Sequence, residues 1–184
     1  TFDISDPAIS VSVLDSIKDS NSNGEIIGDI LTTRLVDFRG YGYMGICAST
    51  VKVGDDKASN ESKALRKAFA TMLAVYRDTV VNSYFGEMAA VIQYPISNTS
   101  WAAPQPADEG YQIAYSTDVD GNPIYTTDMT EEEKYEAALQ AAIGFFKAAG
   151  YTWDEASGMV TAAPAGADMP HDFIIPAAGV GDHP

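Results

Sequence analysis

The most regular hydrophobic pattern in the chain lies at residues 61–77. Apolar residues recur there at a spacing of three and four, which places them on one face of a helix. This face holds Leu65, Ala68, Phe69, Met72, Leu73 and Tyr76. Burying each large member is worth roughly 1.5 to 3 kcal/mol, so the helix should pack on a sheet or another helix. We expect it to back a mixed sheet.

A second helix is predicted at residues 131–149. Thr130 and Glu133 form a capping box, and Glu131 and Glu132 lie at the positive end of the helix dipole. Gly150 suits the C-terminal cap. The residues expected to be buried are Tyr135, Ala138, Leu139, Ala142 and Phe146.

Two shorter helices are predicted as well. One begins at Asp6 and Pro7 and runs to about Lys18 before the NSNG turn at 21–24, and its inward residues are Val13, Leu14 and Ile17. The other covers 79–85, with Asp78 as its cap and Gly86 at its end. Ser59 or Asn60 is expected to cap the helix at 61–77.

Strands are predicted between these helices. Residues 26–36 and 41–48 are rich in β-branched and aromatic residues, and Phe173–Ile175 is an apolar run typical of a buried strand. A turn at Ser157 and Gly158 accompanies one further short strand within 151–163. Helices alternating with strands indicate an α/β or α+β fold, in which helix 131–149 and strand 173–175 suit a right-handed crossover.

The remaining stretches are predicted to be loops within one domain covering 1–184. Prolines exclude a long helix from 87 to 107. Residues 111–116 and 123–127 suit a polar hairpin around the DVDGN turn, making 107–129 a surface excursion. Because Pro184 follows soon after a predicted buried strand, we expect further elements beyond it in a longer protein.

Composition narrows the class of protein. A hydrophobic fraction of 46% is typical of a folded chain, and no apolar run is long enough to span a bilayer. The 26 acidic and 11 basic residues give a net charge of −15, which disfavours binding to nucleic acids and anionic lipids. The lone Cys47 excludes an intrachain disulfide, and its apolar neighbours predict a buried residue in a strand.

Motifs for catalysis or metal binding are missing from the sequence. His171 and His183 lack a partner at helical metal-ligand spacing, and no nucleophile elbow, phosphate loop or dinucleotide fingerprint occurs. Asp118, Asp120 and Asn122 alternate like calcium ligands, but Pro123 stands where such a loop needs glycine, which favours an ordinary Asp-Gly turn. We therefore expect no enzyme, cofactor or metal site.

Four segments together resemble a known family. They are GYGYMGICA at 40–48, ALRKAFATMLAVYRD through VIQYPISNTSWAAP at 64–104, EEEKYEAALQAAIGFFKAAGY at 131–151 and HDFIIPAAGVGDHP at 171–184. Their order is similar to that in the second lobe of the peptide-binding family of extracytoplasmic solute-binding proteins, the receptors of ABC importers. The segment at 107–129 is longer than in that family. The resemblance implies an α/β lobe with a mixed sheet flanked by helices.

The resemblance also implies partners and a location. The first lobe of the same receptor would close over a peptide, permease subunits would receive it, and a lipid anchor outside this segment would hold the protein at the cell surface or in the periplasm. The family's loop after its last matched strand often binds the peptide carboxylate through arginine and tyrosine. Here that loop carries Gly179, Gly181, Asp182 and His183, so the resemblance implies that backbone amides of the two glycines replace the arginine as donors, or that Asp182 meets a positive group.

Aromatic residues add to the expected ligand-binding set. Ten tyrosines and two tryptophans offer flat apolar faces with polar tips, which suit a cleft for varied peptides. Trp101, in a proline-flanked, Ser/Thr-rich segment, is the residue we place nearest the cleft wall, with Ser100 beside it and Tyr43 as a further ligand contact. The alternatives are a secreted non-transport interaction module that binds through the hairpin at 111–127, and a hydrolase with a nucleophile near His171 or His183.

Overall fold

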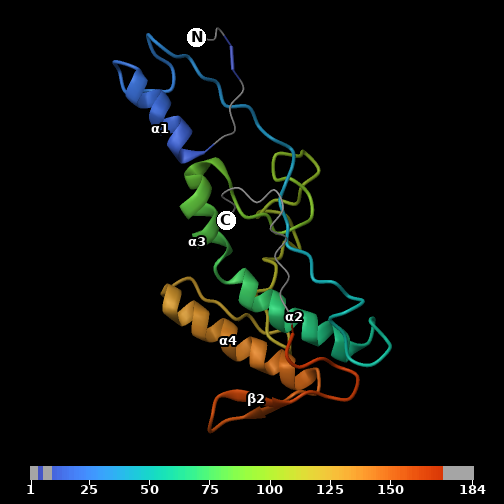
Figure 1. Cartoon of the computed structure of the whole chain (residues 1–184). Coiled ribbons are helices and arrows are strands. Elements are labelled where there is room, and N and C mark those ends of the chain that lie inside the picture. Colours follow the sequence, from blue (N-terminus) through green and yellow to red (C-terminus); the bar gives the residue numbers. More distant parts are fainter. Residues whose placement is uncertain (1–3, 6–9, 172–184) are drawn as a thin grey trace. The chain divides into compact units, whose positions relative to one another are not determined.

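A computed structural model describes residues 4–5 and 10–171. In the described part the helices are α1 (Val11–Ser20), α2 (Asn60–Ala74), α3 (Arg77–Phe85), the 3-10 turn η1 (Gly86–Met88) and α4 (Glu131–Ala148). The strands there are β1 (Thr152–Asp154) and β2 (Met159–Ala162) (Figure 1). The chain divides into two compact units, of which the first includes residues up to 41 and 78–111 and the second includes 42–77 and 112–171.

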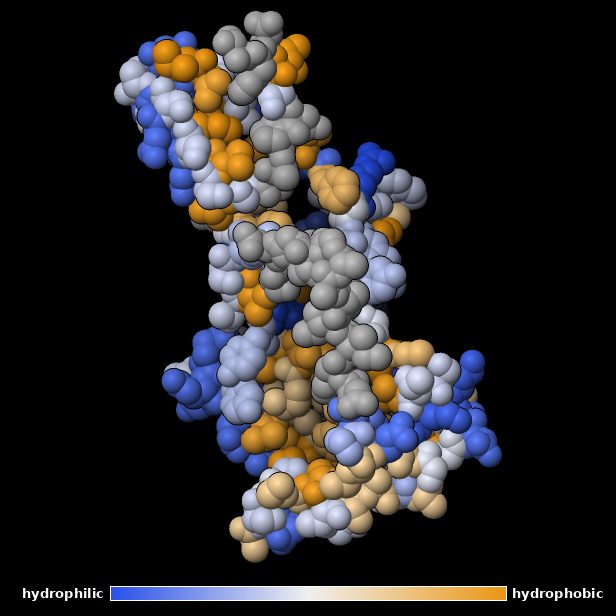
Figure 2. All heavy atoms as spheres, in the orientation of Figure 1, coloured by the Kyte–Doolittle hydropathy of each residue, from blue (hydrophilic) through white to orange (hydrophobic). Residues whose placement is uncertain are grey.

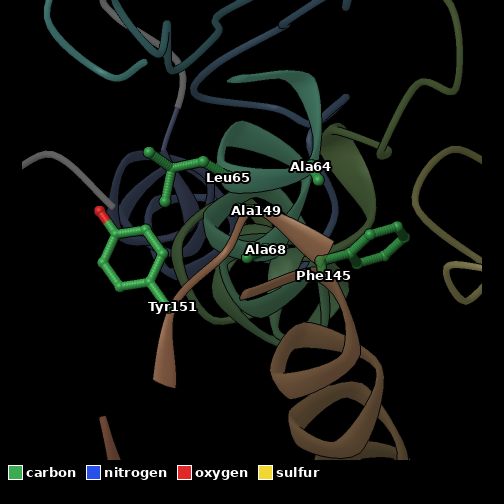
Figure 3. Packing of buried hydrophobic residues seen from close by; sticks show 6 residues of the cluster. All are labelled: Ala64, Leu65, Ala68, Phe145, Ala149 and Tyr151. Atoms are coloured by element: carbon green, nitrogen blue, oxygen red, sulfur yellow. The ribbon is translucent and has the colours of Figure 1, made fainter. Parts of the chain in front are cut away.

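Helices α2 and α4 pack against each other and form the core of the second unit (Figure 1). Leu65 and Ala68 of α2 are fully buried against Phe145 of α4 and Tyr151 beyond it (Figure 3). The ring of Phe69 meets Phe146 edge-on, with centroids 5.3 Å apart. The small side chains of Ala64, Ala68 and Ala149 allow the close approach that this packing needs.

Two serines begin α2 and attach the preceding loop to it. Ser59 is the N-cap, and its hydroxyl accepts the Ser62 N–H at 3.1 Å. The Ser62 hydroxyl is fully buried, accepts the Val53 N–H at 2.9 Å and donates to the Asp56 carbonyl at 2.7 Å. The predicted Ser59 cap is confirmed.

Helix α4 begins at the predicted capping box, and its C-cap is Ala149, with the predicted Gly150 one residue later. Thr130 Oγ1 accepts the Glu133 N–H, and the Glu133 carboxylate accepts the Thr130 N–H at 2.7 Å. Gly150 has φ +91°, a value that favours glycine. The chain then forms the antiparallel hairpin β1–β2, in which Trp153 pairs with Val160. The sequence predicts one strand within 151–163, and the structure has two.

The first unit contains α1 and nearly all of α3. Ser10 caps α1, whose Ile17 is buried while Val13 and Leu14 are half-buried, as expected. The predicted start at Asp6 and Pro7 lies outside the described residues. Gly86, with φ +57°, ends α3 as predicted, but Asp78 lies in the first turn of α3 instead of capping it.

The two strands predicted at 26–36 and 41–48 are wrong. Residues 26–36 contain only an isolated bridge between Ile27 and Thr32, and 41–48 contains no strand. The buried Asn21 side chain holds the first segment in a turn, because its amide donates to the Leu31 carbonyl at 2.9 Å and its oxygen accepts the Leu31 N–H at 2.8 Å. These side-chain hydrogen bonds therefore outweigh the strand propensity of residues 26–36.

The mixed sheet expected behind residues 61–77 is not found among the described residues. The described part holds helices and one two-stranded sheet, and α2 packs on α4. The buried face of α2 is turned toward Ser62, Ala64 and Thr71, which leaves Leu73 and Tyr76 exposed. The strand predicted at 173–175 and its crossover lie outside the described residues.

Apolar side chains remain on the surface of both units. Figure 2 shows hydrophobic residues among hydrophilic ones on the face drawn. Tyr135, predicted to be buried, is 37% exposed and stacks on Tyr76 with ring centroids 5.6 Å apart. Among the described helices, each is too short or too polar to cross a membrane.

Candidate functional site

The candidate site is a depression within the first unit, formed by residues 94–111. This stretch has no regular secondary structure and curls through consecutive turns. The Ser100 N–H donates to the Ser97 carbonyl at 2.9 Å, and the Tyr111 N–H donates to the Asp108 carbonyl at 3.1 Å. The turns bring the rings of Tyr94 and Tyr111 together, with centroids 5.5 Å apart. The segment thus places residues distant in sequence around one space.

The depression has a volume of about 400 Å³. Its lining consists of aromatic, acidic and small residues: Tyr94, Trp101, Ala102, Ala103, Pro104, Asp108, Glu109, Gly110 and Tyr111. Ala103 is buried, whereas Trp101 is 96% exposed. A tryptophan so fully exposed leaves its large apolar face in water, which is unfavourable unless a ligand or partner covers it.

Two carboxylates lie in the same lining. Asp108 uses one oxygen to accept the Gln105 N–H at 2.7 Å, which fixes the turn before it. Neither Asp108 nor Glu109 forms an ion pair within the part of the chain that the structure describes. Aromatic faces beside unneutralised carboxylates offer an environment for a group with an apolar stem and a positive tip.

The predicted ligand-binding residues fall in different places. Trp101 lines the depression, and Ser100 precedes it as a half-buried turn residue outside the lining. Tyr43 is exposed in the second unit. Gly179, Gly181 and Asp182 lie outside the described residues. Ligand binding by every residue of the expected set, Trp101 included, stays a prediction.

Sequence reasoning missed Tyr94, Asp108, Glu109 and Tyr111 as lining residues. In the sequence these residues fall in a proline-containing loop and a predicted hairpin, and their spacing matches neither a helical nor a strand period. The available signal was the grouping of aromatic and acidic residues on either side of Pro104 and Pro106, where prolines and turns fold a chain back on itself.

His171 contacts residues of the α2–α4 core. Its Nε2 and the Asp168 carbonyl both lie 2.8 Å from the Tyr151 hydroxyl, and its ring meets Phe69 at 5.0 Å. Burial raises the pKa of Tyr151, because it disfavours the charged phenolate. These contacts fix residues 168–171 on the α2–α4 core. His183 lies outside the described residues.

Cys47 is exposed and lies outside any strand, so its predicted burial is wrong. Its Sγ lies 3.0 Å from Ser49 Oγ. Hydrogen bonds from Ser49, and then from Thr50, stabilise the thiolate and lower the pKa of the Cys47 thiol to about 7. Sequence alone gave no sign of this, because the hydroxyls act through a local turn.

The loop at 118–122 is the turn that the sequence predicts. One Asp118 oxygen accepts the N–H groups of Asp120 at 3.0 Å and of Asn122 at 2.8 Å. The Asn122 backbone N–H is the main cause of the lowered pKa of Asp118. Hairpin pairing is limited to the bridge between Thr117 and Pro123. No cluster of three or more metal-ligating side chains occurs among residues 4–5 and 10–171.

A smaller depression of about 270 Å³ lies in the second unit between this loop and α4. Its lining includes Val119, Ile124, Ala141 and Gly144. Val119 reaches to within 3.6 Å of where a Cβ on Gly144 would stand. It has no aromatic ring to hold a ligand.

Comparisons with protein families, with curated proteins and with solved structures found no significant match to this chain.

Proposed function

We propose that this chain is part of an extracytoplasmic solute-binding receptor that captures peptides for an ABC importer. The observation that supports the proposal best is the depression at residues 94–111, where the almost fully exposed Trp101 lies beside two tyrosines and two carboxylates. Aromatic faces grip varied side chains without strong selectivity, which is what a receptor for many peptides needs.

A receptor of this kind acts through two lobes. Ligand binds between the lobes and shifts the population toward the closed form, which the permease subunits recognise. This chain would be the second lobe of such a receptor. One lobe supplies only part of the ligand contacts, so we expect weak peptide binding by the chain alone.

Calorimetry with tri-alanine and tri-lysine tests this function on the chain and on the complete receptor. We expect dissociation constants of about 1 mM or weaker for the chain, and at least about a hundredfold tighter binding by the receptor, because two lobes share the contacts. Equal and tight binding by the chain alone would contradict the two-lobed mechanism. Failure of the complete receptor to bind any peptide tested would contradict peptide capture.

A further inference from the structure

The depression at 94–111 lies in a part of the chain that contains no positive charge. Between Arg77 and Lys134 the sequence has no lysine or arginine, while it has ten acidic residues. Asp108 and Glu109 are two of these ten, and both line the depression. No lysine or arginine lines the depression, so these two carboxylates give its lining a negative charge that attracts cations.

The aromatic residues around the depression favour the same charge. The faces of tyrosine and tryptophan carry negative electrostatic potential, so they attract an ammonium or guanidinium group placed over the ring. Trp101, Tyr94 and Tyr111 contribute three such faces to one lining. A lysine or arginine side chain matches this lining, because its apolar stem packs on the rings while its charged tip reaches a carboxylate.

We propose that this depression selects a lysine or arginine side chain of a bound peptide. The proposal rests on the proposed function, because it names the class of peptide that the receptor prefers. Glu109 supplies the principal charge, since Asp108 already accepts the Gln105 N–H and shapes the turn. Trp101 covers the aliphatic stem.

The experiment follows the indole N–H signals of the two tryptophans by NMR while tri-lysine, tri-alanine or tri-glutamate is added to the chain. Trp153→Phe assigns the two signals, and Trp153 in the second unit serves as the internal reference. Because the chain carries a charge of −15, this reference is needed to recognise non-specific attraction of tri-lysine.

Selection predicts that tri-lysine shifts the Trp101 signal at roughly five- to tenfold lower concentration than tri-alanine, and that added salt narrows this difference. The Trp153 signal should not shift at these concentrations of tri-lysine. Glu109→Gln should weaken the tri-lysine effect about two- to fourfold, since an exposed ion pair contributes little more than that. Asp120→Asn removes the same charge from the other unit and should leave the effect unchanged.

Other results overturn the proposal in distinct ways. Equal responses of Trp101 to all three peptides would exclude charge selection and leave peptide capture intact. Equal responses of Trp101 and Trp153 to tri-lysine would show non-specific attraction and exclude the site. If Trp101 responds to no peptide in the chain or in the complete receptor, the depression does not bind peptides and both proposals lose their support.

Discussion

The reactivity of an exposed side chain depends on its immediate neighbours, and Cys47 is the clearest case. It is the one cysteine in the chain, and Ser49 holds the pKa of its exposed thiol at about 7. We expect its alkylation by iodoacetamide to reach half its maximal rate near pH 7, because the thiolate is the reacting form. Rates measured across pH on the intact chain, with mass spectrometry as the readout, check this value.

Ser49→Ala provides the control for that prediction. Without the hydroxyl, the thiolate loses its main hydrogen bond, so the pKa should rise toward the value of an ordinary thiol and the rate profile should move to higher pH. An unchanged profile would mean that Ser49 does not stabilise the thiolate.

Leu65 carries a second prediction at the residue scale. Its side chain is fully buried between α2 and α4, so Leu65→Ala should lower the free energy of unfolding by about 2 to 5 kcal/mol. Leu73→Ala removes the same atoms from the same helix, but Leu73 is 37% exposed, and the loss should stay below about 1 kcal/mol. Equal losses in urea unfolding would contradict the observed orientation of α2.

Periodicity predicted Leu65 and Ala68 correctly and misplaced Leu73 and Tyr76. The three-and-four spacing includes all four residues, and a helix can bury only the part of its face that a partner covers. Ser62 and Thr71 are buried instead, because Ser62 satisfies its hydroxyl on the preceding loop. A pattern based on hydrophobicity alone has no means to place these polar residues in a core.

The stability of a helix depends on its capping residues, and α4 shows this. Thr130→Ala should lower the free energy of unfolding by about 1 kcal/mol, because it leaves the Glu133 N–H without its acceptor. Thr130→Ser keeps the hydroxyl and should recover most of the loss. Chemical denaturation of the three proteins at neutral pH measures both effects, and an equal loss in the two variants would contradict the role of the cap.

The same capping box gives α4 a pH dependence. The Thr130 N–H lowers the pKa of Glu133, whereas the unfolded chain keeps the ordinary value of 4.5. Since the folded state binds this proton less readily, the contribution of Glu133 is present above about pH 4.5 and is lost as pH falls through the lowered folded pKa. Glu133→Gln should therefore reduce the fall in unfolding free energy between about pH 6 and about pH 3.

Helices were predicted better than strands for a physical reason. Caps and spacing are local signals, and Ser59, Thr130 and Gly150 all act within a few residues of the helix they bound. A strand needs a second strand to pair with, and the local sequence does not identify that partner. Residues 26–36 have strand-like composition, yet Asn21 binds Leu31 from ten positions away and turns the segment. The candidate site was also missed for the most part, since turns assemble it.

The whole molecule combines two compact units with a strongly acidic chain. The second unit has a core of two packed helices, and the first presents an open lining of rings and carboxylates. Under the proposed function, this open lining is the surface that receives the peptide. The central claim is that residues 94–111 contact the peptide.

Photo-crosslinking tests this claim most directly. A lysine-containing tripeptide with a benzophenone side chain is irradiated with the complete receptor, and fragment mass spectrometry locates the adducts. We predict adducts at residues 94–111, reduced by excess tri-lysine and by Trp101→Ala, while Trp153→Ala leaves them unchanged. Adducts that avoid 94–111 while excess tri-lysine suppresses them elsewhere would contradict the account.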